Sequence, residues 1–121
     1  MTTWNLQETF CHLLICNGGS CMRRNADEVT NAIRDEIALI GADKQIHTTR
    51  TMCNGRCADA CVVIAYPEGV WYKDITPEQG RELVRKHYSG ERLDDDKTVY
   101  SFDRRFIATG LSITGVEKAP K

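Results

Sequence analysis

Apolar and polar positions recur along this chain first with the period of a strand and then with that of a helix. In the β-prone run 10–15, alternate residues would share one face of a strand. These are Cys11, Leu13 and Ile15. From residue 25 to 39 or 40, apolar residues recur at spacings of four, four and three, which predicts a helix with one apolar stripe. The stripe consists of Val29, Ile33, Ile37 and Ile40. We expect Asn25 to cap this helix and Gly41 to end it.

Further strands and a second helix follow in the same way. Residues 45–51 alternate and are rich in threonine, and residues 61–66 form a stronger apolar strand. A Pro-Glu-Gly turn then returns the chain into residues 70–72, which predicts a β-hairpin. The segment 76–78, Thr-Pro-Glu, opens the second helix with its threonine as the cap, and this helix ends near Gly90.

The order strand, helix, strand, strand, strand, helix predicts the fold class. A βαβ unit followed by a hairpin and a last helix is the thioredoxin-like arrangement, an α/β (α+β) fold with a mixed four-stranded sheet and two main helices. We expect residues 1–93 to form this domain. Residues 94–121 lack a clear period and are interpreted as a C-terminal extension of unknown role.

Composition narrows the functional class. The 121 residues carry a net charge of −1, with 41% hydrophobic and 27% charged residues, which is typical of one soluble domain and gives no basic field for nucleic acid. No signal-peptide pattern opens the chain, and its apolar runs are too short to span a bilayer. We therefore expect a cytoplasmic protein, in which six reduced cysteines indicate metal or redox chemistry rather than disulfides.

Four of the cysteines form two close pairs in glycine-bearing loops. Cys16 and Cys21 flank the first loop, Cys53 and Cys57 flank the second, and each loop follows a predicted strand. A [2Fe-2S] cluster takes two thiolates on each iron, a requirement that these pairs meet. The glycines of the two loops would let backbone N–H groups approach the sulfur atoms. They are Gly18, Gly19 and Gly55.

These residues also carry a family resemblance. The chain resembles the thioredoxin-like [2Fe-2S] ferredoxins and is similar to the [2Fe-2S] small subunit of NADH dehydrogenase and of related hydrogenases. The resemblance covers roughly residues 10 to 93, about two-thirds of the chain. The matching segments are residues 12–21, 53–57, 66–72 and 75–78 and the helix that leads to residues 90–93.

The resemblance implies a one-electron carrier rather than an enzyme. It implies a single [2Fe-2S] cluster as cofactor, with Cys16, Cys21, Cys53 and Cys57 as its ligands. It also implies redox partner proteins, a reductase or an oxidase, and homodimers among the free-standing members. Cys61 lies just beyond the second pair, where the family more often has a glycine-proline type of turn.

Other interpretations stay open at this point. A tetrahedral zinc site also uses paired cysteines, and a thioredoxin-like scaffold can carry a thiol–disulfide redox pair. Cys11 is interpreted as a core residue, and Cys61 either as a packed thiol or as an alternate ligand. The histidines His12 and His47 lie outside the cysteine loops and are interpreted as structural. Four arginines could either offset the charge of a cluster or simply be solvated. They are Arg23, Arg24, Arg50 and Arg56.

Overall fold

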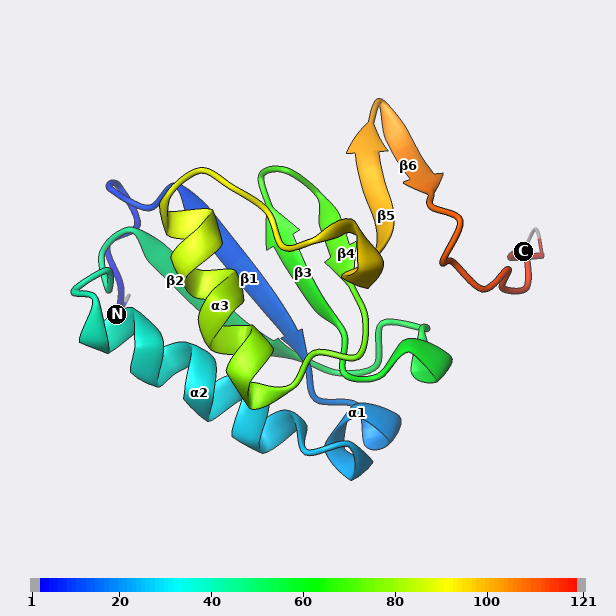
Figure 1. Ribbon diagram of the computed structural model, residues 1–121, viewed down its shortest axis with the longest axis horizontal. Coiled ribbons are helices and arrows are strands. Elements are labelled where there is room, and N and C mark those ends of the chain that lie inside the picture. The colour runs from blue at the N-terminus through cyan, green and yellow to red at the C-terminus, as the bar shows by residue number, and fades with distance from the viewer. Residues whose placement is uncertain (1–2, 120–121) are drawn as a thin grey trace.

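The computed structural model describes residues 3–119, which fold around one mixed six-stranded sheet (Figure 1). The strands lie in the order β2-β1-β3-β4-β5-β6. β1 pairs with β2 in parallel, and all other neighbours are antiparallel. The bounds are β1 (Cys11–Cys16), β2 (Ile46–Thr51), β3 (Val63–Tyr66), β4 (Val70–Tyr72), β5 (Thr98–Asp103) and β6 (Arg105–Ala108).

Two long helices lie side by side over one face of this sheet, as Figure 1 shows. They are α2 (Ala26–Leu39) and α3 (Pro77–Tyr88). Three shorter elements are the helix α1 (Gly19–Arg23) and the 3₁₀ turns η1 (Cys57–Asp59) and η2 (Asp95–Lys97). None of the helices within residues 3–119 is both long and apolar enough to cross a membrane.

The core lies between the helices and the sheet, where the predicted stripes meet. Cys11, Leu13 and Ile15 are buried in β1, which confirms the alternation read from the sequence. Full burial of a large aliphatic side chain contributes about 1.5–3 kcal/mol, and the opposing stripes supply several such residues. They include Val29, Ile33 and Ile37 of α2 and Leu83 and Val84 of α3. The two helices approach closely at Gly80, where an added Cβ would lie 2.9 Å from Ile33 Cγ1.

The helix ends agree with the sequence in two places and differ in one. Thr76 caps α3 through a capping box with Gln79, and Gly41 follows α2 in the left-handed conformation with φ 68°. Asn25 stands at the N-cap position of α2, but its side chain makes no capping hydrogen bond. The φ of Asn25, 66°, explains the difference, because the backbone of a residue whose side chain caps a helix is normally extended.

The expected sheet of four strands is the main correction to the predicted fold. The class is α/β as predicted, but β5 and β6 from the C-terminal extension add two strands beside β4. Arg104, with φ 66°, makes the tight turn between them, and Val99 of β5 is fully buried. The four residues of β6 are all exposed, so no alternation marked this segment in the sequence. The predicted division at residue 93 stays a prediction, and the last two residues of the extension lie outside the described range.

Candidate metal centre

All four paired cysteines line one cavity at the end of the sheet. The cavity is lined by Cys16, Gly18, Ser20, Cys21, Cys53, Arg56 and Cys57. The two loops that the sequence separates by more than thirty positions therefore meet in space. This convergence is the central property of the site, because it brings four sulfur donors together.

The parallel pairing of β1 and β2 causes the convergence. Cys16, the last residue of β1, is in register with Thr51, the last residue of β2. The Asn17 N–H donates to the Thr51 carbonyl at 2.8 Å, so the two strands stay paired up to the point where both loops begin. Cys53 follows two residues later. Parallel strands deliver their carboxyl ends to the same edge, and both cysteine loops begin at that edge.

The first pair is held by a short helix rather than by an open loop. The sequence predicted turn residues from 17 to 20, but the structure begins α1 at Gly19, which places Cys21 inside a helical turn. Gly18 lies against the second loop, and a Cβ added to it would come within 2.7 Å of the Cys53 Cα. Contact this close requires glycine, since any side chain here would push the two loops apart. Cys16 and Cys21 are each only 3% exposed.

The second pair is more open to solvent. Cys53 and Cys57 are both exposed, with their Sγ atoms 3.6 Å apart. The Gly55 N–H donates to Cys53 Sγ at 3.3 Å, and the φ of Gly55 is 78°. This left-handed backbone turns the amide toward the sulfur, as the sequence analysis expected of a loop glycine. Asn54 fixes the loop to the strand end through a 2.6 Å hydrogen bond to Thr51 Oγ1.

The two thiols of the buried pair differ in acidity. Burial raises the pKa of Cys16, but hydrogen bonds to its sulfur, first from the Gly18 backbone, outweigh burial and leave the pKa below its ordinary value. Burial raises the pKa of Cys21 to about 12, and the nearby Cys16 thiolate acts in the same direction. Cys16 is therefore the first of the pair to deprotonate, whereas Cys21 needs a cation to compensate its charge.

The four thiols lie in the cavity as two pairs. Within residues 3–119, no three His, Cys, Asp or Glu side chains are gathered closely enough to hold a single metal ion, although four cysteines share the cavity. A mononuclear zinc site needs all donors around one point, whereas a [2Fe-2S] cluster takes them two by two. The thiol pairs and the N–H donor at Cys53 thus fit such a cluster.

The four candidate arginines are distributed differently. Arg56 lines the cavity, where its Nε donates to Asp59 Oδ2 at 2.9 Å. Arg50 forms a largely exposed ion pair with Asp27, also at 2.9 Å. Arg23 and Arg24 are exposed. Sequence reasoning named Arg56 but missed Asp59, although its spacing of three from Arg56 beside Cys57 was visible.

The remaining candidates are not among the residues that line the cavity. Cys61 is buried, and its Sγ donates to the Arg24 carbonyl at 3.0 Å and to the Cys21 carbonyl at 3.4 Å. Cys11 lies in the core as predicted, and burial raises its pKa to about 12. The rings of His12 and His47 lie 4.9 Å apart between centroids and are tilted by 48°, and His12 Nε2 lies 2.7 Å from Thr49 Oγ1.

Comparisons with known proteins agree with this site. The sequence model of one family, the thioredoxin-like [2Fe-2S] ferredoxins, matches residues 5–88. A relative from Priestia megaterium, assigned as a 2Fe-2S ferredoxin, is 45% identical over 98% of this chain and 94% of its own. A 2Fe-2S ferredoxin from Aquifex aeolicus is 34% identical over 67% of this chain and 81% of its own.

A solved structure shows the same fold. The thioredoxin-like [2Fe-2S] ferredoxin from Aquifex aeolicus superposes with a TM-score of 0.72 at 30% identity, over 78% of this chain and 94% of that one. The thiol–disulfide and zinc interpretations are not favoured by these relatives. The family model and the relatives agree with the fold and with the four thiols in one cavity. The chain therefore belongs to the family of thioredoxin-like [2Fe-2S] ferredoxins.

Proposed function

We propose that Cys16, Cys21, Cys53 and Cys57 are the ligands of the single [2Fe-2S] cluster of this ferredoxin, and that it catalyses no reaction of its own. The chain is an iron–sulfur electron carrier, as its family and relatives establish. The observation that carries the ligand assignment is the convergence of these four thiols, from two loops, on one cavity. When bound, the cluster supplies a site that accepts and releases one electron.

The two cysteine pairs would bind the cluster from different sides. Cys16 and Cys21 would bind it from the buried side, and Cys53 and Cys57 from the solvent side. The Gly55 N–H, which already donates to Cys53 Sγ, would stabilise negative charge on that sulfur. Gly18 would keep the two loops in contact.

We further propose that redox partners approach at the second loop. Cys53 and Cys57 are the exposed ligands, and the neighbouring Met52 is 87% exposed. A flexible apolar methionine beside an exposed ligand gives a partner a contact surface that adapts to its shape. A partner seated there would lie close to the cluster, which short-range electron transfer requires.

Two finer expectations remain proposals. A homodimer is supported by the sheet face away from α2 and α3, where the half-buried Leu14 and Trp71 lie in register on either side of the buried Ile64. Sedimentation of the purified protein would give twice the chain mass if this holds. A cytoplasmic location rests on the cysteine usage, since all six cysteines are free.

Anaerobic purification and reconstitution test the function directly. We expect a red-brown protein with about two irons and two sulfides per chain, and visible bands that dithionite bleaches. A colourless protein that holds one zinc ion per chain, or a coloured one whose bands do not respond to a one-electron reductant, would contradict the proposal.

A further inference from the structure

We propose that Arg56 is a positioning residue, which ties the C-terminal tail, residues 109–115, to the loop that carries Cys53 and Cys57. By this tie it holds the loop in its ligand-binding conformation. The inference rests on the ligand set proposed above and adds a role for a segment that the family model, which ends at residue 88, does not cover.

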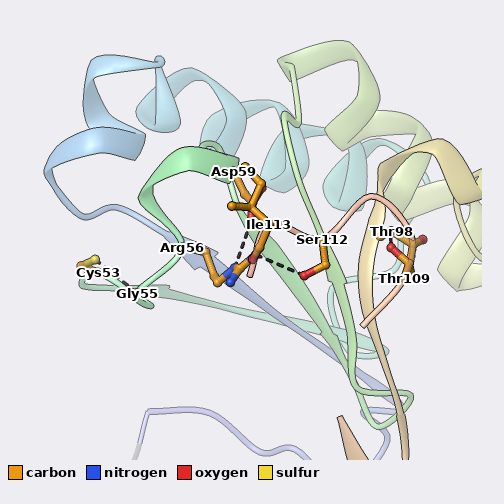
Figure 2. Close-up of polar contacts among 8 residues, drawn as sticks. All are labelled: Cys53, Gly55, Arg56, Asp59, Thr98, Thr109, Ser112 and Ile113. Atoms are coloured by element: carbon orange, nitrogen blue, oxygen red, sulfur yellow. Dashed lines mark hydrogen bonds and ion pairs between the residues drawn. The ribbon is translucent and has the colours of Figure 1, made fainter. Parts of the chain in front are cut away.

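The guanidinium of Arg56 joins two segments that are distant in sequence (Figure 2). On one side its Nε donates to Asp59 Oδ2 at 2.9 Å. On the other side its Nη2 donates to the Ile113 carbonyl at 2.7 Å and to Ser112 Oγ at 3.3 Å. The planar fork of arginine allows these separate contacts, whereas the ammonium of lysine is a single point charge.

This ion pair is far more buried than the other arginine contact near the site. The Arg56 side chain is 13% exposed and that of Asp59 is 2% exposed, whereas Arg50 and Asp27 are 45% and 52% exposed. The guanidinium carbon of Arg56 also lies 5.1 Å from the centre of the Tyr100 ring in β5, which adds a cation–π contact. This burial makes the geometry of the ion pair specific, because removing either side chain would leave the charge of the other buried and without a partner.

Beyond Thr109, the tail depends on the Arg56 contact for its position. At Thr109 the tail is bound to β5, where the Thr109 N–H donates to the Val99 carbonyl at 3.0 Å. Thr109 Oγ1 donates to the carbonyl of Thr98, which lies beside it in Figure 2, at 2.6 Å. Farther along, Ile113 is 55% exposed, so side-chain burial contributes little to holding it. A Cβ added to Gly115 would lie 3.4 Å from Arg56 Nη1, so the tail passes directly along the guanidinium.

Arg56 lies inside the loop of the second cysteine pair, so its contact with the tail bears directly on the metal site. It immediately precedes Cys57 and lies three residues after Cys53, and its carbonyl accepts the Asp59 N–H at 2.9 Å at the start of η1. Asp59 is fixed in turn, because its carbonyl accepts the Asp74 N–H at 3.0 Å. The exposed half of the ligand set is thus held at Arg56 by the tail and by a buried carboxylate, which lowers the conformational freedom of the loop.

The test compares a paired variant with matched controls. The double variant Arg56→Gln with Asp59→Asn removes both charges together, so that no buried charge is left alone. Ser112→Ala removes one contact between Arg56 and the tail. Arg56→Lys keeps the positive charge but lacks the planar guanidinium with its separate N–H donors. Arg50→Gln controls for the loss of a positive charge near the second loop. Ile37→Val, in the last turns of α2, controls for a general loss of stability.

Two measurements are made on each variant. Hydrogen exchange of the apo-protein reports on the tail amides of Leu111 and Ser112, whose N–H groups donate to Thr109 Oγ1 and to the Thr109 carbonyl. The rate of cluster loss to an iron chelator reports on the loop. We expect the double variant to exchange the tail amides and to lose the cluster each about tenfold faster than the parent, with smaller increases for Arg56→Lys and Ser112→Ala. Arg50→Gln should match the parent, and Ile37→Val should lower the melting temperature without these changes.

The outcomes separate this inference from the proposed function. Tail exchange or cluster loss within twofold of the parent in the double variant would overturn the inference while leaving the ligand set intact. Equal acceleration of cluster loss in Ile37→Val would overturn it as well, since stability alone would then explain the effect. A parent protein that takes up no cluster would contradict the proposed function, and the apo-protein exchange would still decide whether Arg56 holds the tail.

Discussion

Gly18 lies so close to Cys53 that a β-carbon on Gly18 would come within 2.7 Å of the Cys53 Cα and 2.9 Å of its Cβ. Two loops, one from each parallel strand, thus touch backbone to backbone. The contact sets how near the buried thiol pair stands to the exposed pair, so this separation depends on a residue that supplies no thiol ligand.

The substitution Gly18→Ala should weaken cluster binding by steric means alone. The φ of Gly18 is −68°, which alanine adopts without strain, so only the clash with Cys53 is introduced. Overpacking of this kind costs about 1–3 kcal/mol, and we expect the share of chains that retain iron in a chelator competition to fall about fivefold or more.

Gly19→Ala is the matched control. A Cβ at Gly19 would meet only the flexible end of Arg23, at 4.0 Å, so its iron content should equal that of the parent. Equal retention by the two alanine variants would show that the loops can separate without harm.

Serine substitutions test the ligand set one cysteine at a time. We expect loss or marked perturbation of the visible spectrum for Cys16→Ser, Cys21→Ser, Cys53→Ser and Cys57→Ser, because serine oxygen is a poor donor to this cluster. Cys11→Ser should retain the spectrum, since Cys11 lies in the core.

Cys61→Ser is the discriminating variant in this series. The Cys61 thiol donates to two backbone carbonyls, and serine can donate to the same atoms, so we expect the cluster to be retained. Loss of the spectrum in Cys61→Ser together with retention in Cys57→Ser would assign the fourth ligand to Cys61 instead.

Gly80→Ala should destabilise the protein, although alanine is the better helix former by about 1 kcal/mol. The new Cβ would lie 2.9 Å from Ile33 Cγ1, where α3 crosses α2, and this clash opposes the gain in helix propensity. Urea unfolding should show a net loss of about 1–2 kcal/mol. Gly110→Ala, where nothing lies within 4 Å of an added Cβ, serves as the control, and a stabilised Gly80→Ala would show that the helices can move apart freely.

His87 should make stability fall as the pH is lowered below about 6.5. Burial lowers its pKa, with the charge of Arg92 acting in the same direction and that of Glu68 opposing both. His87 Nε2 lies 2.8 Å from the Tyr72 hydroxyl, and Glu68 Oε2 lies 3.9 Å from its Nδ1. The unfolded chain then binds the proton more readily than the folded one, so acid favours unfolding.

Chemical unfolding at pH 7.5 and at pH 5.5 checks this dependence. The parent should lose stability between the two, and His87→Gln should lose less. His12, whose pKa is also lowered by burial and by His47, should leave part of the dependence in place. An identical pH dependence in parent and His87→Gln would exclude His87 as a source.

The elements with one buried face were predictable because their period is written in the sequence. The α2 stripe through Val29, Ile33 and Ile37, the alternation in β1 and the Thr76 cap all appear where the pattern placed them. The same holds for the gathering of the four cysteines, since two strands of one parallel pair precede their loops.

The rest was not predictable, because it depends on contacts between distant segments. The hairpin of β5 and β6 is largely exposed and therefore shows no two-residue period. Asn25 looks like a capping residue, yet its φ of 66° is set by the junction between α1 and α2. The link from Arg56 to Ser112 joins positions 56 residues apart, a pairing that no local pattern encodes.

The parallel register of Cys16 with Thr51 also has a consequence for the order of folding. The two cysteine loops become neighbours only after the whole βαβ crossover, including α2, has closed, and such long-range closure is slow relative to helix formation. A newly made chain therefore presents two separate thiol pairs until its native topology is reached. With both pairs as the proposed ligands, a cluster could be bound by all four thiols only after that step.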